Sequence, residues 1–232
     1  MPVYQLDEGL WFPNPKYGEP DGLFAVGGDL SVNRLLLAYS HGIFPWYAYQ
    51  LYNEPHWYCP MDRFVIFPKE IHISHSMKQL MRQGKYHITI DHDFEGVIKG
   101  CSKADCRNTD MGAWLGPQMI RAYTQLHKMG IAHSVEVWEA KETENNTSIP
   151  LRLVGGLYGI DLNGAFFGES MFSLVPSASK LALTHLAQHL EKKGYSFIDC
   201  QFETPHLLSM GGQHIPYEEY MAILNANAHK KE

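Results

Sequence analysis

The fold is decided by the stretch Gly164-Ala-Phe-Phe-Gly-Glu-Ser-Met-Phe-Ser173. Successive side chains of a β-strand point to opposite faces, so a strand over residues 165–172 places Phe167, Glu169 and Met171 on one face. The other face then holds Phe166, Gly168, Ser170 and Phe172. We therefore expect Glu169 to be a carboxylate between two apolar side chains.

A second apolar run, Tyr195-Ser-Phe-Ile-Asp-Cys-Gln-Phe202, continues this pattern. Alternation along it predicts that Asp199 and Gln201 share one face of a strand, while Cys200 points to the opposite face. The thiol is then expected to lie away from the polar pair.

Two carboxylates in aromatic-rich strands need an explanation. An ionised carboxylate is costly to bury without a partner, and such groups gather where a cleft holds something polar. The spacing fits a structural role equally well, in which Glu169 and Asp199 cap a loop or pair with Lys180. From the pattern alone, both alternatives stay open.

The flanking segments predict an α+β fold. We expect a helix that begins at Pro117, strands over 133–140 and 151–162, a hairpin turn at Asn163-Gly164, and a helix capped by Ser177 that Gly194 ends. The order of helix, three strands, helix and strand is similar to the core of the acetyltransferase (GNAT) superfamily. The glycine-spaced loop that binds the pyrophosphate of CoA is absent before Ser177, so we expect no cofactor.

Residues 1–60 are rich in Pro, Gly and aromatic residues and are expected to form a small N-terminal α/β domain. Ser31 is a favourable N-cap for a helix over 32–40. Pro45 restricts the preceding residue to extended conformations, so Trp46 is presented in a defined direction, either to a ligand or into the core. Strand-like runs begin at Met61, and we assign residues 61–232 to a GNAT-like catalytic domain.

Composition limits the class of protein. A chain of 232 residues with 45% hydrophobic content can bury a large core, and its net charge of −6 argues against broad, non-specific nucleic-acid binding. No leader and no long apolar run is apparent, so a cytoplasmic protein is expected. The cysteines, which lack CxxC spacing, are expected to be free thiols: Cys59, Cys101, Cys106 and Cys200.

One basic cluster is a candidate for binding anions. A short helix that begins after Ser74 or Ser76 places Lys78, Arg82 and Lys85 on the side opposite its apolar stripe. Such a face is usually only solvated, but this cluster stands out in an acidic chain. No metal is expected, because the best pair, His185 and His189, lacks the glutamate of a metalloprotease helix.

Several separated motifs resemble the bacterial leucyl/phenylalanyl-tRNA–protein transferase family over essentially the whole chain. They are Gly27-Gly-Asp-Leu-Ser31 with Gly22-Leu before it, Gly42-Ile-Phe-Pro-Trp46, His133-Ser-Val-Glu-Val-Trp138, Gly155-Gly-Leu-Tyr-Gly159, Gly168-Glu-Ser-Met-Phe-Ser173, Ala178-Ser-Lys180 and Ile198-Asp-Cys-Gln201. The resemblance implies transfer of Leu or Phe, with Met as a further candidate, from aminoacyl-tRNA to proteins with N-terminal Arg or Lys. That modification marks the acceptor for degradation.

The resemblance also implies roles for individual residues. Asp199 and Gln201 match the family's catalytic pair, and Glu169 matches a glutamate that holds either the substrate α-amino group or the terminal ribose. An activated ester needs neither ATP nor metal, only a neutral amine near its carbonyl and a route for the proton. Our hypothesis is that Asp199 helps to deprotonate the amine, directly or through Gln201, which orients the attacking nitrogen.

Further matches concern the donor. Residues matched to the adenosine end, in contact or in support, are Trp46, Trp114, Tyr39 and Tyr123. Met171 matches a residue of the amino-acid side-chain pocket, to which we add Leu157 and Leu186. Three positions depart from the best-known family pattern: Leu157 stands where the family has Met, Leu186 stands where an aromatic residue can occur, and the loop around Trp114 differs. These departures affect the order of preference among the donor amino acids. Lys78, Arg82 and Lys85 are expected to contact the tRNA backbone.

Two other functions are compatible with parts of the pattern. An aminoacyl-tRNA-dependent transferase that acts on a cell-wall precursor would share the chemistry, but such chains usually contain two GNAT-like units. A non-catalytic RNA-binding protein would not need Asp199 and Gln201 on one strand face. We expect a monomer that binds aminoacyl-tRNA and protein acceptors and that does not associate with a membrane.

Overall fold

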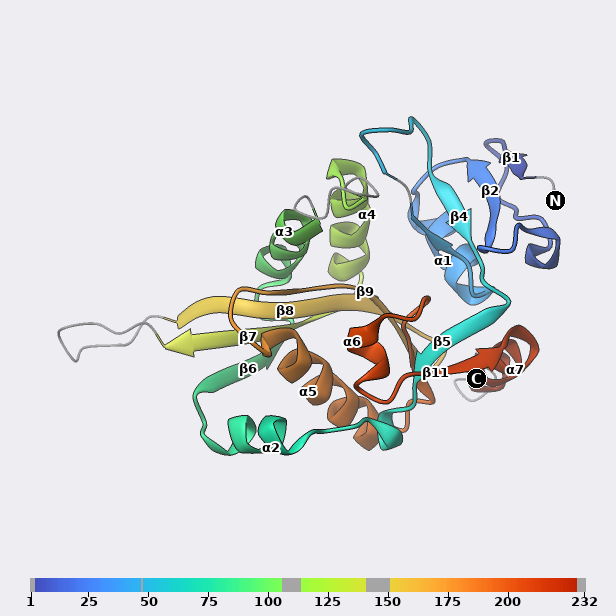
Figure 1. Ribbon diagram of the computed structural model, residues 1–232. Coiled ribbons are helices and arrows are strands. Elements are labelled where there is room, and N and C mark those ends of the chain that lie inside the picture. The colour runs from blue at the N-terminus through green and yellow to red at the C-terminus, as the bar shows by residue number, and fades with distance from the viewer. Residues whose placement is uncertain (1–2, 47, 106–113, 141–150, 229–232) are drawn as a thin grey trace.

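The computed structural model describes residues 3–46, 48–105, 114–140 and 151–228 (Figure 1). Two β-sheets and the helices around them confirm the α+β class. No helix within the described ranges is long and apolar enough to cross a membrane. Cys59 and Cys200 are free thiols, Cys101 forms no disulfide with either of them, and Cys106 lies outside the described residues.

The smaller sheet is built from the N-terminal quarter of the chain. Its order is β1-β2-β4-β3, with β1 at Tyr4–Leu6, β2 at Leu23–Gly27, β3 at Phe44–Pro45 and β4 at His56–Tyr58. Helix α1, Val32–Ser40, begins where predicted, because the Ser31 hydroxyl accepts the Arg34 backbone N–H at 3.3 Å. A helix and a regular sheet are thus both present in the segment expected to form a small N-terminal α/β domain.

The larger sheet has the order β11-β5-β10-β9-β8-β7-β6. Its strands are β5 at Asp62–Ile66, β6 at Tyr86–Ile90, β7 at Ala132–Ala140, β8 at Leu151–Leu162, β9 at Ala165–Ser173, β10 at Phe197–Asp199 and β11 at Gln213–Pro216. Strands β9 and β10 are parallel because α5, Ala178–Lys193, crosses between them, whereas the other neighbours are antiparallel. The predicted order of three strands, a helix and a further strand is thus present.

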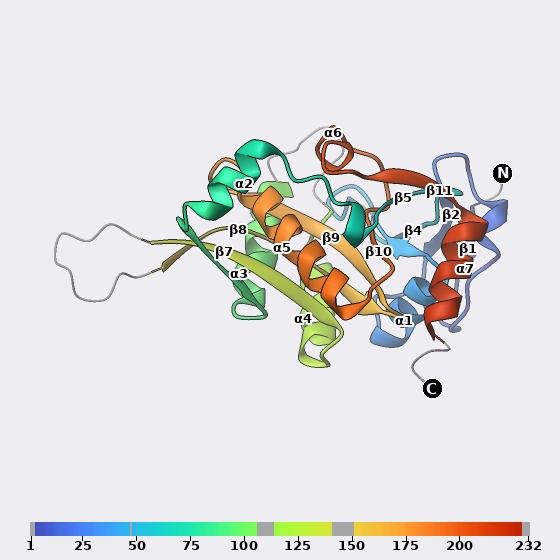
Figure 2. The same ribbon diagram turned by 90° about the horizontal axis from the view of Figure 1, so that it is seen from below.

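Helices cover both faces of this sheet. Figures 1 and 2 show α2, His75–Arg82, together with α5 on one face, and α3, Phe94–Asp105, with α4, Pro117–Lys128, on the other. Short helix α6, Pro205–Leu208, and α7, Tyr217–Ala228, complete the chain, and Pro15–Tyr17 and Pro68–Glu70 form single 3₁₀ turns.

The hydrophobic cores do not follow the predicted domain boundary. One core packs Phe24 and Trp57 of the small sheet in the same cluster as Phe167 and Phe197 of the large sheet. The second core lies under α5. The two parts therefore share a core, and the division into residues 1–60 and 61–232 stays a proposal about chain organisation.

A β-bulge at Glu169 overturns the predicted strand faces. Tyr158 pairs with Ser170 and Gly159 pairs with Gly168, so Glu169 is the extra residue of β9. An extra residue resets the alternation of side chains along a strand. Met171 therefore packs toward the core under α5, on the face opposite Glu169, and the prediction that these two residues share a face is wrong.

The start of the crossover helix and the strand after it also differ from expectation. Strand β10 ends at Asp199 rather than extending over 195–202, and Gln201 has a positive φ of 60°. At the start of α5, Ser177 occupies the N-cap position, but its side chain makes no capping bond. The Ser173 hydroxyl accepts the Ser179 backbone N–H instead, at 2.8 Å.

Candidate active site

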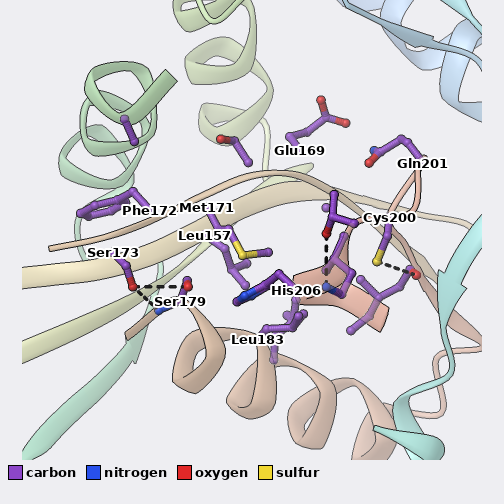
Figure 3. Close-up of a pocket in the computed structure, with 17 residues that line it drawn as sticks. Leu157, Glu169, Met171, Phe172, Ser173, Ser179, Leu183, Cys200, Gln201 and His206 are labelled. Atoms are coloured by element: carbon purple, nitrogen blue, oxygen red, sulfur yellow. Dashed lines mark hydrogen bonds between the residues drawn. The ribbon is translucent and has the colours of Figure 1, made fainter. Parts of the chain in front are cut away.

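A cavity of about 510 Å³ lies between β9, α5 and α6 (Figure 3). Its apolar wall includes the three residues predicted for the side-chain pocket, Leu157, Met171 and Leu186. Glu169 and Gln201 lie at the side of the cavity away from α5. The bulge explains this arrangement, because it lets neighbouring parts of β9 present a carboxylate to one side and a thioether to the other.

A second, smaller cavity of about 240 Å³ adjoins the first. Trp46 and Trp114, the tryptophans predicted for the adenosine end, both line it, and Phe202 packs 5.5 Å from the Trp46 ring. Glu169 and Gln201 line both cavities. The polar groups therefore stand where an aromatic slot meets an apolar slot.

Glu169 is held by two tyrosines from different parts of the chain. The Tyr39 hydroxyl, on α1, donates to Oε1, and the Tyr123 hydroxyl, on α4, donates to Oε2, each at 2.7 Å. Burial raises the pKa of the Glu169 carboxyl group to about 7, although the two hydroxyl donors act in the opposite direction. The carboxyl group is thus balanced between its two protonation states near neutral pH.

Tyr39 and Tyr123 have no exposed surface. The Tyr39 ring packs edge-on against Phe167 at 5.1 Å, and the Tyr123 ring packs against Tyr158 at 5.4 Å. Burial also raises the pKa of both phenols well above the usual value. Direct contact with the adenosine end is therefore incompatible with their position, and of the two predicted roles only support of a neighbouring group remains.

Asp199 is completely buried, and donors surround its carboxylate. Arg63 binds it in bidentate fashion, Nε to Oδ1 at 2.9 Å and Nη2 to Oδ2 at 2.7 Å. The Tyr220 hydroxyl donates to Oδ2 at 2.8 Å, and the backbone N–H of Gln201 donates to Oδ1 at 2.9 Å. Asp199 lines neither cavity, so the hypothesis that it deprotonates an amine directly is wrong in this geometry.

The Arg63 guanidinium lies between two aromatic rings, 4.8 Å from the centroid of Phe44 and 4.9 Å from that of Tyr220. Its pKa is raised, because the neighbouring Asp199 charge outweighs the opposing effect of burial. Neither Arg63 nor Tyr220 is among the residues predicted from the sequence. A single arginine at the start of the apolar run Phe64-Val-Ile-Phe67 was the available signal for the first, whereas nothing local marks the second.

Gln201 leaves the strand in a left-handed conformation, which is unfavourable for a residue with a side chain. The bond from its N–H to Asp199 helps to hold this turn. Cys200 packs against the core under α5, away from Asp199 as predicted, but it also lines both cavities beside Gln201. Burial raises the pKa of the Cys200 thiol far above neutrality, so the thiol is protonated and is a poor nucleophile.

The basic cluster is only partly as predicted. Lys78 and Arg82 are placed on α2, one turn apart. Lys85 lies beyond the end of that helix, and its Nζ pairs with Glu139 at 2.9 Å. Two cations of the three, rather than all three, therefore share the helix face.

This geometry suits acyl transfer by direct attack of an amine on an activated carbonyl. The junction offers a carboxyl group that changes protonation near neutral pH, together with an amide side chain that can orient a nitrogen. The adjoining slots can hold a flat ring and an apolar side chain at the same time.

Comparison with known proteins agrees with this chemistry. The family described as leucyl/phenylalanyl-tRNA protein transferase matches residues 65–225, and the family described as its N-terminal domain matches residues 28–61. The chain is similar to proteins named leucyl/phenylalanyl-tRNA–protein transferase in three bacteria. It is 44% identical to that of Thermodesulfovibrio yellowstonii over 231 residues, which is 100% of this chain and 89% of the relative. It is 44% identical to that of Desulforapulum autotrophicum over 233 residues, covering 100% and 95%, and 45% identical to that of Syntrophotalea carbinolica over 231 residues, covering 99% and 94%.

Proposed function

The chain belongs to the leucyl/phenylalanyl-tRNA–protein transferase family, and we propose that the two joined cavities form its active site. Enzymes of this family move an amino acid from tRNA to the N-terminus of a protein, and so does this chain. We propose Leu and Phe as donor residues, with Met as a third, and N-terminal Arg or Lys as acceptors marked for degradation. The observation that carries the assignment of the site is the meeting of an aromatic slot and an apolar slot at Glu169 and Gln201.

The donor would occupy both slots. The terminal adenine stacks between or beside Trp46 and Trp114, which contributes about 1–3 kcal/mol per stacked base. The aminoacyl side chain enters the cavity lined by Leu157, Met171 and Leu186. The flexible Met171 side chain can adapt there to either a Leu or a Phe side chain. The ester carbonyl then lies at the junction.

The acceptor amine attacks at the junction. Gln201 orients the nitrogen through its side-chain amide, and Asp199, which is out of reach of the substrate, positions Gln201. Arg63 and Tyr220 keep Asp199 in place. Glu169 faces the attacking amine in this proposal, because a carboxyl group balanced between its two protonation states suits contact with a group that must lose a proton.

We propose a cytoplasmic monomer that uses no metal or cofactor. The tRNA backbone would pass over α2, where Lys78 and Arg82 supply cations, with Lys85 beside them. Contacts of this kind position a nucleic acid without reading its sequence.

A direct assay tests the reaction. The protein is incubated with charged Leu-tRNA and a peptide that begins with Arg, and the product is measured by mass spectrometry. We expect addition of one leucyl residue, and we expect none with uncharged tRNA or with the same peptide acetylated at its N-terminus. Transfer to a cell-wall precursor but not to the peptide would instead support the alternative transferase.

A further inference from the structure

Three oxygen-bearing side chains close into a ring beneath the junction of the cavities. Tyr39 Oη lies 2.7 Å from Glu169 Oε1, Tyr123 Oη lies 2.7 Å from Glu169 Oε2, and the two tyrosine oxygens are themselves 2.7 Å apart. Each of these distances is typical of an O–H···O hydrogen bond. Both tyrosine side chains are fully buried, so water does not complete their bonding.

A count of hydrogens shows what this ring lacks when Glu169 is ionised. Each tyrosine hydroxyl carries one hydrogen, and an ionised carboxylate carries none. Only two hydrogens are therefore available for three oxygen–oxygen contacts, so one contact has no hydrogen between its two oxygens. When Glu169 takes up a proton, each of the three contacts receives one hydrogen, and the ring is complete.

Two charged groups act on the ring from neighbouring strands. Tyr158 on β8 packs against Tyr123, Asp199 on β10 disfavours a second negative charge, and Arg63 on β5 acts in the opposite direction. Since Arg63 is already engaged by Asp199 at 2.7 Å, it does not supply a direct partner for Glu169. The ring is thus the immediate environment that decides where a proton on Glu169 is held.

We propose that Glu169, Tyr39 and Tyr123 act as one proton-holding ring, which takes a proton from the attacking amine and returns it to the leaving ribose oxygen. This inference rests on the proposed function of the site. The neutral amine forms the new N–C bond, the nitrogen loses one proton to Glu169, the C–O bond to the ribose breaks, and the ribose oxygen recovers that proton. Glu169 is the catalytic residue in this step, and the tyrosines are positioning residues that share the proton.

The first test measures stability, which does not depend on activity. The pKa of Glu169 is raised from 4.5 to about 7 by folding, so this group's stabilising contribution is complete below about pH 4.5 and is lost as the pH rises toward 7. Glu169→Gln places an amide there, which both donates and accepts and so closes the ring at every pH. We expect the wild-type protein to lose thermal stability over this range relative to Glu169→Gln.

The second test measures single-turnover transfer of Leu to the Arg peptide with saturating donor. Glu169→Gln should fold but transfer at least about 100-fold more slowly, because it takes up no proton. Tyr39→Phe and Tyr123→Phe should each slow transfer about tenfold at pH 7, and the double variant should be little slower than the slower single one. Each single variant should also raise the pH at which the transfer rate is half-maximal by about one unit, since the Glu169 carboxylate loses a hydrogen-bond donor.

Tyr195→Phe is the matched control, because Tyr195 donates to Asp161 in the same chemical pairing but lies outside the site. Tyr195→Phe should change neither the transfer rate nor the pH at which that rate is half-maximal. The ring is refuted if Glu169→Gln transfers within about threefold of wild type, if the two tyrosine variants behave like Tyr195→Phe, or if the stability profiles of wild type and Glu169→Gln coincide. Failure of the wild-type protein to transfer Leu would instead refute the proposed function, and the stability test would still judge the ring.

Discussion

Arg63 and Asp199 form a bidentate ion pair with almost no exposed surface, and the Asp199 carboxylate also accepts the backbone N–H of Gln201. The pair thus links β5 and β10 at the point where the chain turns into the two cavities. The Asp199 carboxylate, a type of group that often acts as a catalytic acid or base, here helps to position the residues that line the cavities.

Asp199→Asn should lower stability as well as activity. The substitution leaves a buried guanidinium without its counter-charge, which costs about 3–5 kcal/mol. Denaturant unfolding would measure the loss, and Arg63→Met in the Asp199→Asn background should recover part of it. Unchanged stability with abolished single-turnover chemistry would instead mean that Asp199 acts on the substrate.

Gln201→Gly separates the backbone turn from the side chain. Glycine relieves a left-handed strain of about 1–2 kcal/mol, so this variant should be at least as stable as wild type, whereas Gln201→Ala keeps the strain. Both variants lack the amide, and both should slow the chemical step with little change in donor binding. If Gln201→Gly transferred Leu at the wild-type rate, the side chain would have no role in orienting the amine.

Leu157→Phe should change the choice of donor. Leu157 lines the larger cavity, and filling that space disfavours the bulkier Phe relative to Leu by about 1–3 kcal/mol. Competition between Leu-tRNA and Phe-tRNA measures the ratio. Leu190→Phe, which crowds the same core outside that cavity, should lower stability without shifting the ratio. An equal loss for both donors in Leu157→Phe would remove Leu157 from the specificity pocket.

The cations of α2 should contribute more to tRNA binding than the lysine that follows the helix. Replacing Lys78 and Arg82 by Ala should weaken binding and reduce the slope of log K against log salt by about one for each phosphate that the protein no longer neutralises. Lys85→Ala should have less effect, because Lys85 is already paired with Glu139. Filter binding over a range of salt concentrations measures the slope. Unchanged affinity and slope in the Lys78 and Arg82 double variant would place the tRNA elsewhere.

Local sequence signals determined most of the secondary structure. Ser31 and Ser74 begin helices because their hydroxyls accept backbone N–H groups, and Asn163 and Gly164 form a tight hairpin with positive φ values of 51° and 64°. Gly194 ends the crossover helix in a left-handed conformation. Each of these signals acts within a few residues, so it can be recognised without knowledge of the rest of the chain.

The sequence by itself also determined the family and several of the residues that line the site, since the motifs contain Trp46, Glu169 and Gln201. Only the tertiary structure decided what those residues do. The bulge that places the Met171 side chain on the opposite face of β9 depends on the pairing of β9 with β8. The side-chain partners of Asp199 and Glu169 come from four other elements far along the chain. The protonation state and reach of a carboxylate depend on which distant groups surround it, and alternation along a single strand carries no information about them.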